Sequence, residues 1–195
     1  EIAKAAVHYP GWDATFRVDH WDATQTVPYR VRHGQEATFT GTIRPDPIDK
    51  SAIAVAVMSC NSSNTPGQRD EMIAGLRAAD PDLLFFAGDQ TYRHTEHTGG
   101  WLEFGLQFRD VMRDRPTVTI PDDHDVGQAN LWGAGGGRAT NAAGASGGYF
   151  YPTAYVNMVE RQQTAHLPDP VDPKPIEGGI GVYFTRLILG GVDFA

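Results

Sequence analysis

Three short apolar runs each end in a cluster of polar side chains of the types that bind metal ions. The runs are residues 53–58, 83–87 and 117–121, and the clusters that follow them are Ser59-Cys60-Asn61, Gly88-Asp89-Gln90-Thr91-Tyr92 and Asp122-Asp123-His124-Asp125. Short apolar runs of this kind are typical of buried strands. Ligands of open α/β sheets bind at the carboxyl ends of the strands, so we expect a thiolate, carboxylates, a phenolate and an imidazole to meet there. This combination indicates a metal site, and hydrolysis is the chemistry that it favours.

The segments around these runs have helical spacing. Residues 68–79 and 101–113 repeat apolar side chains on one helical face, and residues 149–163 predict a further helix after Pro152. Alternation of strand and helix predicts an α/β fold, with a mostly parallel sheet that is covered by helices. Residues 127–148 are rich in Gly, Ala and Asn and predict a long loop.

The first 48 residues have a different pattern. Their alternating side chains predict half-exposed strands at three places, residues 15–19, 29–32 and 37–43. The prolines within residues 44–47 interrupt this pattern, because proline lacks an N–H donor and restricts the residue before it. We therefore predict a β-rich module, or the remnant of one, at residues 1–48 and a second domain at residues 49–195.

The end of the chain is also β-rich. Residues 181–184 and 186–189 predict a hairpin or one bent strand. The chain ends at Ala195 within apolar β-rich sequence, and it begins without a methionine or a leader. We expect it to be a fragment of a longer protein.

The composition excludes some classes of function. A net charge of −8 argues against binding to nucleic acid through phosphates, because such binding requires a basic surface. Hydrophobic residues make up 41% of the chain, yet no apolar run approaches the ~20 residues needed to span a bilayer. The single cysteine cannot form an internal disulfide bond.

Each candidate residue also has an ordinary structural interpretation. Asp89 is either a ligand on a tight turn or a helix cap, and Cys60 is either a metal-bound thiolate or a small buried hydrophobe. Asn61 is a ligand or a turn former, whereas His94 and His97 either line the mouth of the site or lie free on the surface. The chain lacks Gly-x-Ser-x-Gly and the P-loop lysine motif, which argues against a serine triad and a nucleotide P-loop.

Taken together, the three clusters resemble the calcineurin-like metallophosphoesterases, and within them the alkaline phosphatase D (PhoD-like) group. The resemblance covers about residues 50–127, and residues 29–47 look like the tail of the β-sandwich module that precedes the catalytic domain in that group. It implies that this chain holds the N-terminal half of a double-sheet α/β sandwich, preceded by the remnant of a small β-sandwich.

The resemblance also implies a centre of two or more metal ions. Cys60 takes the place of the usual first-strand Asp and binds iron, and Asp89 bridges two metals. Tyr92 matches a metal-binding tyrosine, and Asp123 stands where an Asn usually binds the second metal. Iron with calcium is the combination that the PhoD-like group implies, whereas zinc or manganese occur in relatives.

These residues predict hydrolysis of phosphate esters by a hydroxide that the metal ions activate. His124 would be catalytic by helping the leaving group or the transition state, and Asn61 and Arg93 would contact the substrate. The family's later histidine motifs have no convincing match after Asp125, so we expect the 195-residue chain to be inactive alone and the parent protein to be the enzyme.

Several alternatives stay open at this point. A non-catalytic binding protein with a vestigial metallophosphoesterase fold would hold no stoichiometric metal, and metal analysis separates it from an enzyme. The substrate is a phosphomonoester or a phosphodiester, and the sequence does not choose between them. The family implies export from the cell, with a signal segment outside this chain, and the oligomeric state is left open.

Overall fold

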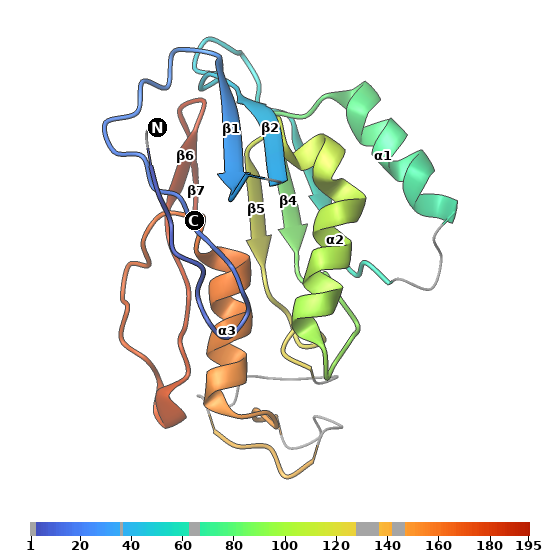
Figure 1. Cartoon of the computed structure of the whole chain (residues 1–195), viewed down its shortest axis with the longest axis vertical. Coiled ribbons are helices and arrows are strands. Elements are labelled where there is room, and N and C mark those ends of the chain that lie inside the picture. The colour runs from blue at the N-terminus through green and yellow to red at the C-terminus, as the bar shows by residue number, and fades with distance from the viewer. Residues whose placement is uncertain (1–2, 36, 63–66, 128–136, 142–146) are drawn as a thin grey trace.

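A parallel sheet of three strands lies at the centre of the computed structural model (Figure 1). The structure describes residues 3–35, 37–62, 67–127, 137–141 and 147–195. Its elements, in chain order, are β1 (Val27–His33), β2 (Ala37–Ile43), β3 (Val55–Met58), α1 (Gly67–Ala79), β4 (Leu83–Ala87), α2 (His97–Met112), β5 (Thr117–Ile120), α3 (Thr153–Thr164), a 3-10 turn (Glu177–Gly179), β6 (Leu187–Leu189) and β7 (Val192–Phe194).

The central sheet has the order β3-β4-β5, and both strand pairs are parallel. Met58 lies opposite Phe86, and Phe86 lies opposite Thr119, so the three carboxyl ends stop close to one level. Helices α1 and α2 connect successive strands, as parallel pairing requires. The predicted α/β alternation with a parallel sheet is confirmed.

Strand β4 is apolar on both faces because both faces of the sheet are covered. Leu84 and Phe86 pack against Phe104 and Phe108 of α2, together with residues of α1. Leu83, on the opposite face, packs against the hairpin of β6 and β7 and against Val118 of β5. Helix α3 lies beside β5 (Figure 1). A continuous apolar run, without alternation, is the expected pattern for such a strand.

Helix α2 begins at His97, four residues before the predicted start at residue 101. Gly99 and Gly100 weaken the helical signal in the sequence, because glycine is a poor helix former. Gly100 is needed for packing, since a Cβ atom there would lie 2.0 Å from Thr91 Oγ1. Among the described helices, none is both long and apolar enough to span a membrane, as the sequence predicts.

Two predicted strands are wrong, and part of one predicted loop is not described. Residues 15–19 form no strand; the extended segment 14–18 has no ladder partner among the described residues, and Arg17 instead forms an ion pair of 2.6 Å with Asp169. Residues 181–184 also form no strand.

The C-terminal hairpin joins β6 to β7 through Gly190-Gly191, whose φ angles of 58° and 74° suit a two-residue hairpin turn. Of the predicted loop, residues 128–136 and 142–146 lie outside the described residues.

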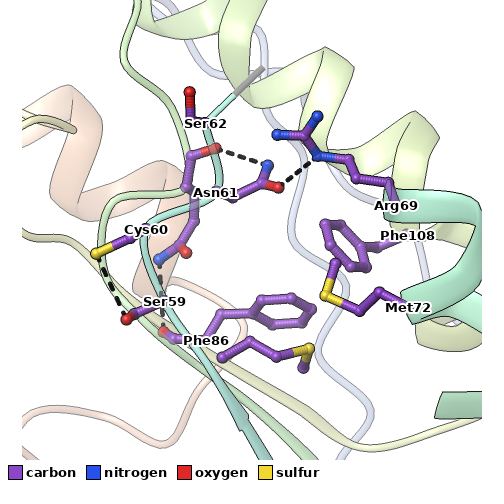
Figure 2. A pocket seen from close by; sticks show the side chains of 10 residues that line it. Ser59, Cys60, Asn61, Ser62, Arg69, Met72, Phe86 and Phe108 are labelled. Atoms are coloured by element: carbon purple, nitrogen blue, oxygen red, sulfur yellow. Dashed lines mark hydrogen bonds between the residues drawn. The ribbon is translucent and has the colours of Figure 1, made fainter. Parts of the chain in front are cut away.

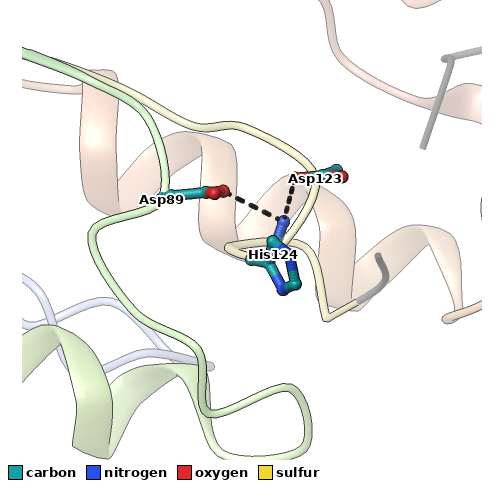
Figure 3. A group of neighbouring side chains, drawn as sticks. All are labelled: Asp89, Asp123 and His124. Carbon is teal, nitrogen blue, oxygen red and sulfur yellow. Dashed lines mark hydrogen bonds between the residues drawn. The ribbon is translucent and has the colours of Figure 1, made fainter. Parts of the chain in front are cut away.

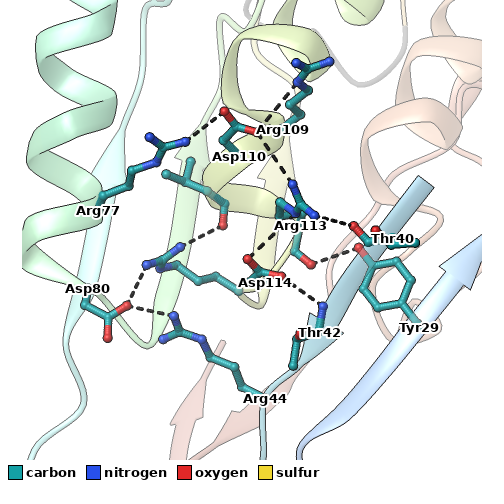
Figure 4. A network of polar contacts seen from close by, with 12 residues as sticks. Tyr29, Thr40, Thr42, Arg44, Arg77, Asp80, Arg109, Asp110, Arg113 and Asp114 are labelled. Carbon is teal, nitrogen blue, oxygen red and sulfur yellow. Dashed lines mark hydrogen bonds and ion pairs between the residues drawn. The ribbon is translucent and has the colours of Figure 1, made fainter. Parts of the chain in front are cut away.

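The antiparallel hairpin of β1 and β2 is fastened to the end of α2 by polar contacts (Figure 4). The Tyr29 hydroxyl donates to the carbonyl of Arg113 at 2.9 Å, and the N–H of Thr42 donates to Asp114 Oδ1 at 2.9 Å. The Arg113 guanidinium donates in return to the carbonyl of Thr40 at 2.9 Å. The domain boundary at residue 48 stays a prediction.

The N-terminal segment contacts α3 at a great distance along the sequence. Arg161 Nη2 forms an ion pair of 3.1 Å with Asp13 Oδ1. Gln162 Nε2 donates to the carbonyl of Gly11 at 2.7 Å. These contacts join the N-terminal segment to α3.

The α2 core supports a direct test of the packing. Phe108 is 1% exposed against Phe86, whereas Leu106 on the same helix is 65% exposed. We expect Phe108→Ala to lower the free energy of unfolding by about 3–5 kcal/mol, because it leaves a cavity in the core. Leu106→Ala, the matched control, should change it by less than about 0.5 kcal/mol. Urea unfolding of both variants measures this, and equal losses would contradict the described packing.

Candidate metal centre

Backbone hydrogen bonds beyond the end of β3 bring two of the predicted clusters together. The N–H of Cys60 donates to the carbonyl of Gly88 at 3.2 Å, and the N–H of Asn61 donates to the carbonyl of Asp89 at 2.8 Å. The first and second strand ends are therefore held side by side by backbone hydrogen bonds.

The backbone at these strand ends is strained. Cys60 and Asp89 have φ angles of 57° and 56°, a left-handed conformation that costs a residue with a side chain about 1–2 kcal/mol. Gly88, between the strand and Asp89, has a φ of 89°, and a Cβ atom there would lie 2.4 Å from Asp122 Cβ. Strain of this kind clusters at functional positions, and here it falls on two candidate ligands.

Asp89 is the hub of the side-chain contacts. Its Oδ2 accepts from the Tyr92 hydroxyl at 3.0 Å and lies 3.8 Å from Cys60 Sγ. Its Oδ1 accepts from the backbone N–H of His124 at 3.3 Å (Figure 3). One carboxylate thus contacts groups from the ends of all three strands.

These side chains form a set that fits a metal ion. Ligand atoms of Asp89, Asp123 and His124 all lie within 4.8 Å of one another. The Cys60 thiol and the Tyr92 phenol lie next to the same carboxylate, which adds a soft sulfur and a phenolic oxygen to carboxylate and imidazole ligands. Cys60 is a free, exposed thiol and not the buried hydrophobe of the alternative interpretation.

The electrostatics of the hub favour a cation. Burial raises the pKa of Asp89. Burial and the neighbouring Asp89 carboxylate also raise the pKa of the Tyr92 phenol. Without a nearby cation, both groups therefore favour their neutral, protonated forms. A bound cation reverses this preference, so metal binding here is coupled to release of protons.

Asp125 supports the site by joining two of its loops. It is 1% exposed, and burial raises its pKa to about 7. Its Oδ1 accepts from the N–H of Thr91 at 3.0 Å, and its Oδ2 accepts from the N–H of Asp122 at 3.1 Å. One side chain therefore ties the loop after β4 to the loop after β5. The sequence placed Asp125 in the cluster but gave no reason to assign it this role.

The two histidines that follow Tyr92 differ in their positions. His94 Nε2 lies 2.7 Å from His124 Nδ1, and the two ring centroids are 4.9 Å apart. Burial lowers the pKa of His94, and the charge of His124 lowers this pKa further. His97 is instead buried, so it lies neither at the mouth of the site nor on the surface, and burial lowers its pKa to about 4.

The two predicted substrate contacts lie outside the metal cluster. Arg93 is engaged by carboxylates, with Nη1 lying 3.4 Å from Glu96 Oε2 and Nη2 paired with Glu103. Asn61 faces Arg69, whose Nε donates to Asn61 Oδ1 at 2.8 Å. Sequence reasoning missed Arg69, because a lone arginine in the first turn of a helix gives no signal of its environment.

Removal of the Asp125 carboxylate tests its supporting role. Asp125→Ala leaves the buried N–H group of Thr91 and the part-buried N–H group of Asp122 without their acceptor, and we expect a loss of about 1–3 kcal/mol in the free energy of unfolding of the metal-free protein. Asp49→Ala, at an exposed position, is the control and should change it by less than about 0.5 kcal/mol. Urea unfolding without metal measures both, and an unchanged Asp125→Ala variant would contradict the role.

Comparison with known proteins gives one structural match. No family model matches the sequence, and no curated protein matches it. A purple acid phosphatase from yellow lupin (Lupinus luteus) seeds superposes with a TM-score of 0.48 and 17% sequence identity. The match covers 75% of this chain, which spans only 31% of the lupin chain. A TM-score below 0.5 does not establish a common fold.

Proposed function

We propose that this chain carries the metal centre of a metal-dependent phosphoesterase of the calcineurin-like superfamily, in its PhoD-like branch. The observation that supports the proposal is the set of contacts around Asp89. A thiol, a phenol, a second carboxylate and an imidazole, from three different strand ends, surround this one carboxylate.

The donor set suggests how metals would be held. Cys60 and Tyr92 suit ferric iron, because thiolate and phenolate donate charge to the metal. Asp89 lies between these two residues and His124, where one carboxylate can bridge two ions. Asp123 would hold the second ion, for which the family resemblance suggests calcium. When bound, such ions lower the pKa of water from 15.7 to ~7 and offset the charge of a phosphoryl group.

The chain's own groups would position the leaving oxygen. The backbone N–H of His124 is fixed by Asp89 Oδ1 at 3.3 Å and by Asp123 Oδ1 at 2.8 Å. The imidazole is held from the side by the Tyr92 ring, with centroids 4.3 Å apart. In this orientation His124 would donate a proton to the leaving oxygen or stabilise its charge. Asn61 and Arg93 stay proposed substrate contacts.

The rival proposal is a binding protein with a vestigial site. The cluster around Asp89 combines carboxylate, imidazole, thiol and phenol groups, and this donor set supports a metal-dependent enzyme over this rival. Export from the cell remains part of the proposal through the family resemblance. Both phosphomonoesters and phosphodiesters fit the proposed chemistry.

The central carboxylate gives the sharpest test. Loss of an outer-shell partner costs about 10–100-fold in metal affinity, and we expect Asp89→Asn, which removes a central ligand, to cost at least about 100-fold. Metal titration of the chain measures this, and p-nitrophenyl phosphate hydrolysis by the full-length protein should fall with it. Asp110→Asn on α2 is the control and should change neither quantity. Unchanged metal affinity and turnover in Asp89→Asn would refute the proposal.

Colour tests the assignment of iron. The iron-loaded protein should absorb visible light through charge transfer from Cys60 and Tyr92. Tyr92→Phe should shift or remove the phenolate band, and Cys60→Ser should remove the thiolate band. Tyr9→Phe, at an exposed tyrosine remote in sequence, should leave the spectrum unchanged. A colourless, iron-free and fully active protein would show that the metals are others.

A further inference from the structure

A cavity of about 180 Å³ lies next to Cys60, on the side of α1 and α2 (Figure 2). Its polar end is formed by Asn61, Ser62 and Arg69, and apolar side chains of the sheet and helices form the rest, among them Met72, Phe86 and Phe108. Cys60 borders the cavity and also lies 3.8 Å from Asp89, so the cavity adjoins the candidate metal centre.

Arg69 places a positive charge in the wall of this cavity, and no described carboxylate forms an ion pair with it. The residue is only 6% exposed, and its Nη1 atom is buried without a hydrogen-bond partner. Its Nε donates to Asn61 Oδ1 at 2.8 Å, which is a neutral acceptor. No ion pair of Arg69 occurs in the described part of the chain.

Other arginines of the structure are paired differently. Arg77, two helical turns further along α1, forms an ion pair of 2.8 Å with Asp110, and the largely buried side chain of Arg115 forms one of 2.6 Å with Asp80. A buried charge is costly unless it is paired. Among the described residues, Arg69 therefore has no anionic partner of the kind that Arg77 and Arg115 have.

Asn61 holds the guanidinium in place. The Asn61 Nδ2 group donates to the carbonyl of Gln90 and to Gln107 Oε1, both at 3.2 Å, which leaves its Oδ1 facing Arg69. The first turn of α1 also borders the cavity, and the N-terminal end of a helix carries partial positive charge. The charge is therefore pre-oriented, as in a site for an oxyanion.

We infer that the Arg69 cavity binds a phosphate-type oxyanion of the substrate, with Arg69 and Asn61 as its polar wall. The inference rests on the proposed function and extends it, because it assigns part of the substrate affinity to a charge outside the metal centre. The oxyanion is either the reacting phosphoryl group or a second anionic group of the same substrate.

Binding of inorganic phosphate to the metal-free protein tests the site apart from hydrolysis. Arg69→Gln removes the charge but keeps an amide donor for Asn61, and we expect it to weaken phosphate binding at least about tenfold by calorimetry. Arg77→Gln, on the same helix, should stay within about twofold of the wild type. Equal phosphate affinity of Arg69→Gln and the wild type overturns the inference, whether or not the protein hydrolyses esters.

A measurement on the wild type covers the case in which the Arg69 variant fails to fold. Phosphate should shift the Nε–H resonance of Arg69 and leave that of Arg77 in place, and an unshifted Arg69 resonance overturns the inference.

The kinetic comparison uses phenyl phosphate and 4-carboxyphenyl phosphate with the full-length protein. A higher KM of Arg69→Gln for both identifies the reacting phosphoryl group as the ligand. A higher KM for the carboxylated ester alone identifies a second anionic group.

Discussion

The contacts of the Asp89 carboxylate are the constraint on which the rest of the site depends. This side chain meets a phenol, a thiol and a backbone N–H from the three strand ends only because those ends stop at one level of the sheet. The register between β3, β4 and β5 sets that level. The left-handed backbone of Cys60 and Asp89 then turns both side chains toward the same point. The positions of these candidate ligands therefore depend on the backbone torsion angles of two residues.

Buried polar side chains connect the loops that carry the candidate ligands to each other and to α3. Gln90 Nε2 donates to the carbonyl of Ile120 at 2.9 Å and to Gln163 Oε1 of α3 at 3.2 Å. Asp125 joins the loops from the other side. The hydrogen bond between Gln90 and Gln163 also connects α3 to the loop that carries Asp89.

The sequence predicted the parts of the molecule whose signals are local. The apolar runs at Leu83–Ala87 and Thr117–Ile120 gave the strand bounds of the structure, and the polar clusters after them gave the residues that meet. It failed where a partner far along the chain decides. Residues 15–19 alternate like a strand but have no ladder partner among the described residues, and Arg69 resembles a surface charge until its burial is known. Asp125 also required the structure, since its role is defined by two backbone groups of other segments.

The sequence separation of the contacts has a consequence for how the molecule assembles. All the groups around Asp89 come from residues 60–124, which contain only two strand-to-strand crossovers. The contact of Asp13 with Arg161 instead spans 148 residues. Closing a long chain segment costs more entropy than closing a short one, and folding rates fall as contacts become less local. The locality of these contacts therefore predicts that the ligand cluster closes before the contact between the N-terminal segment and α3.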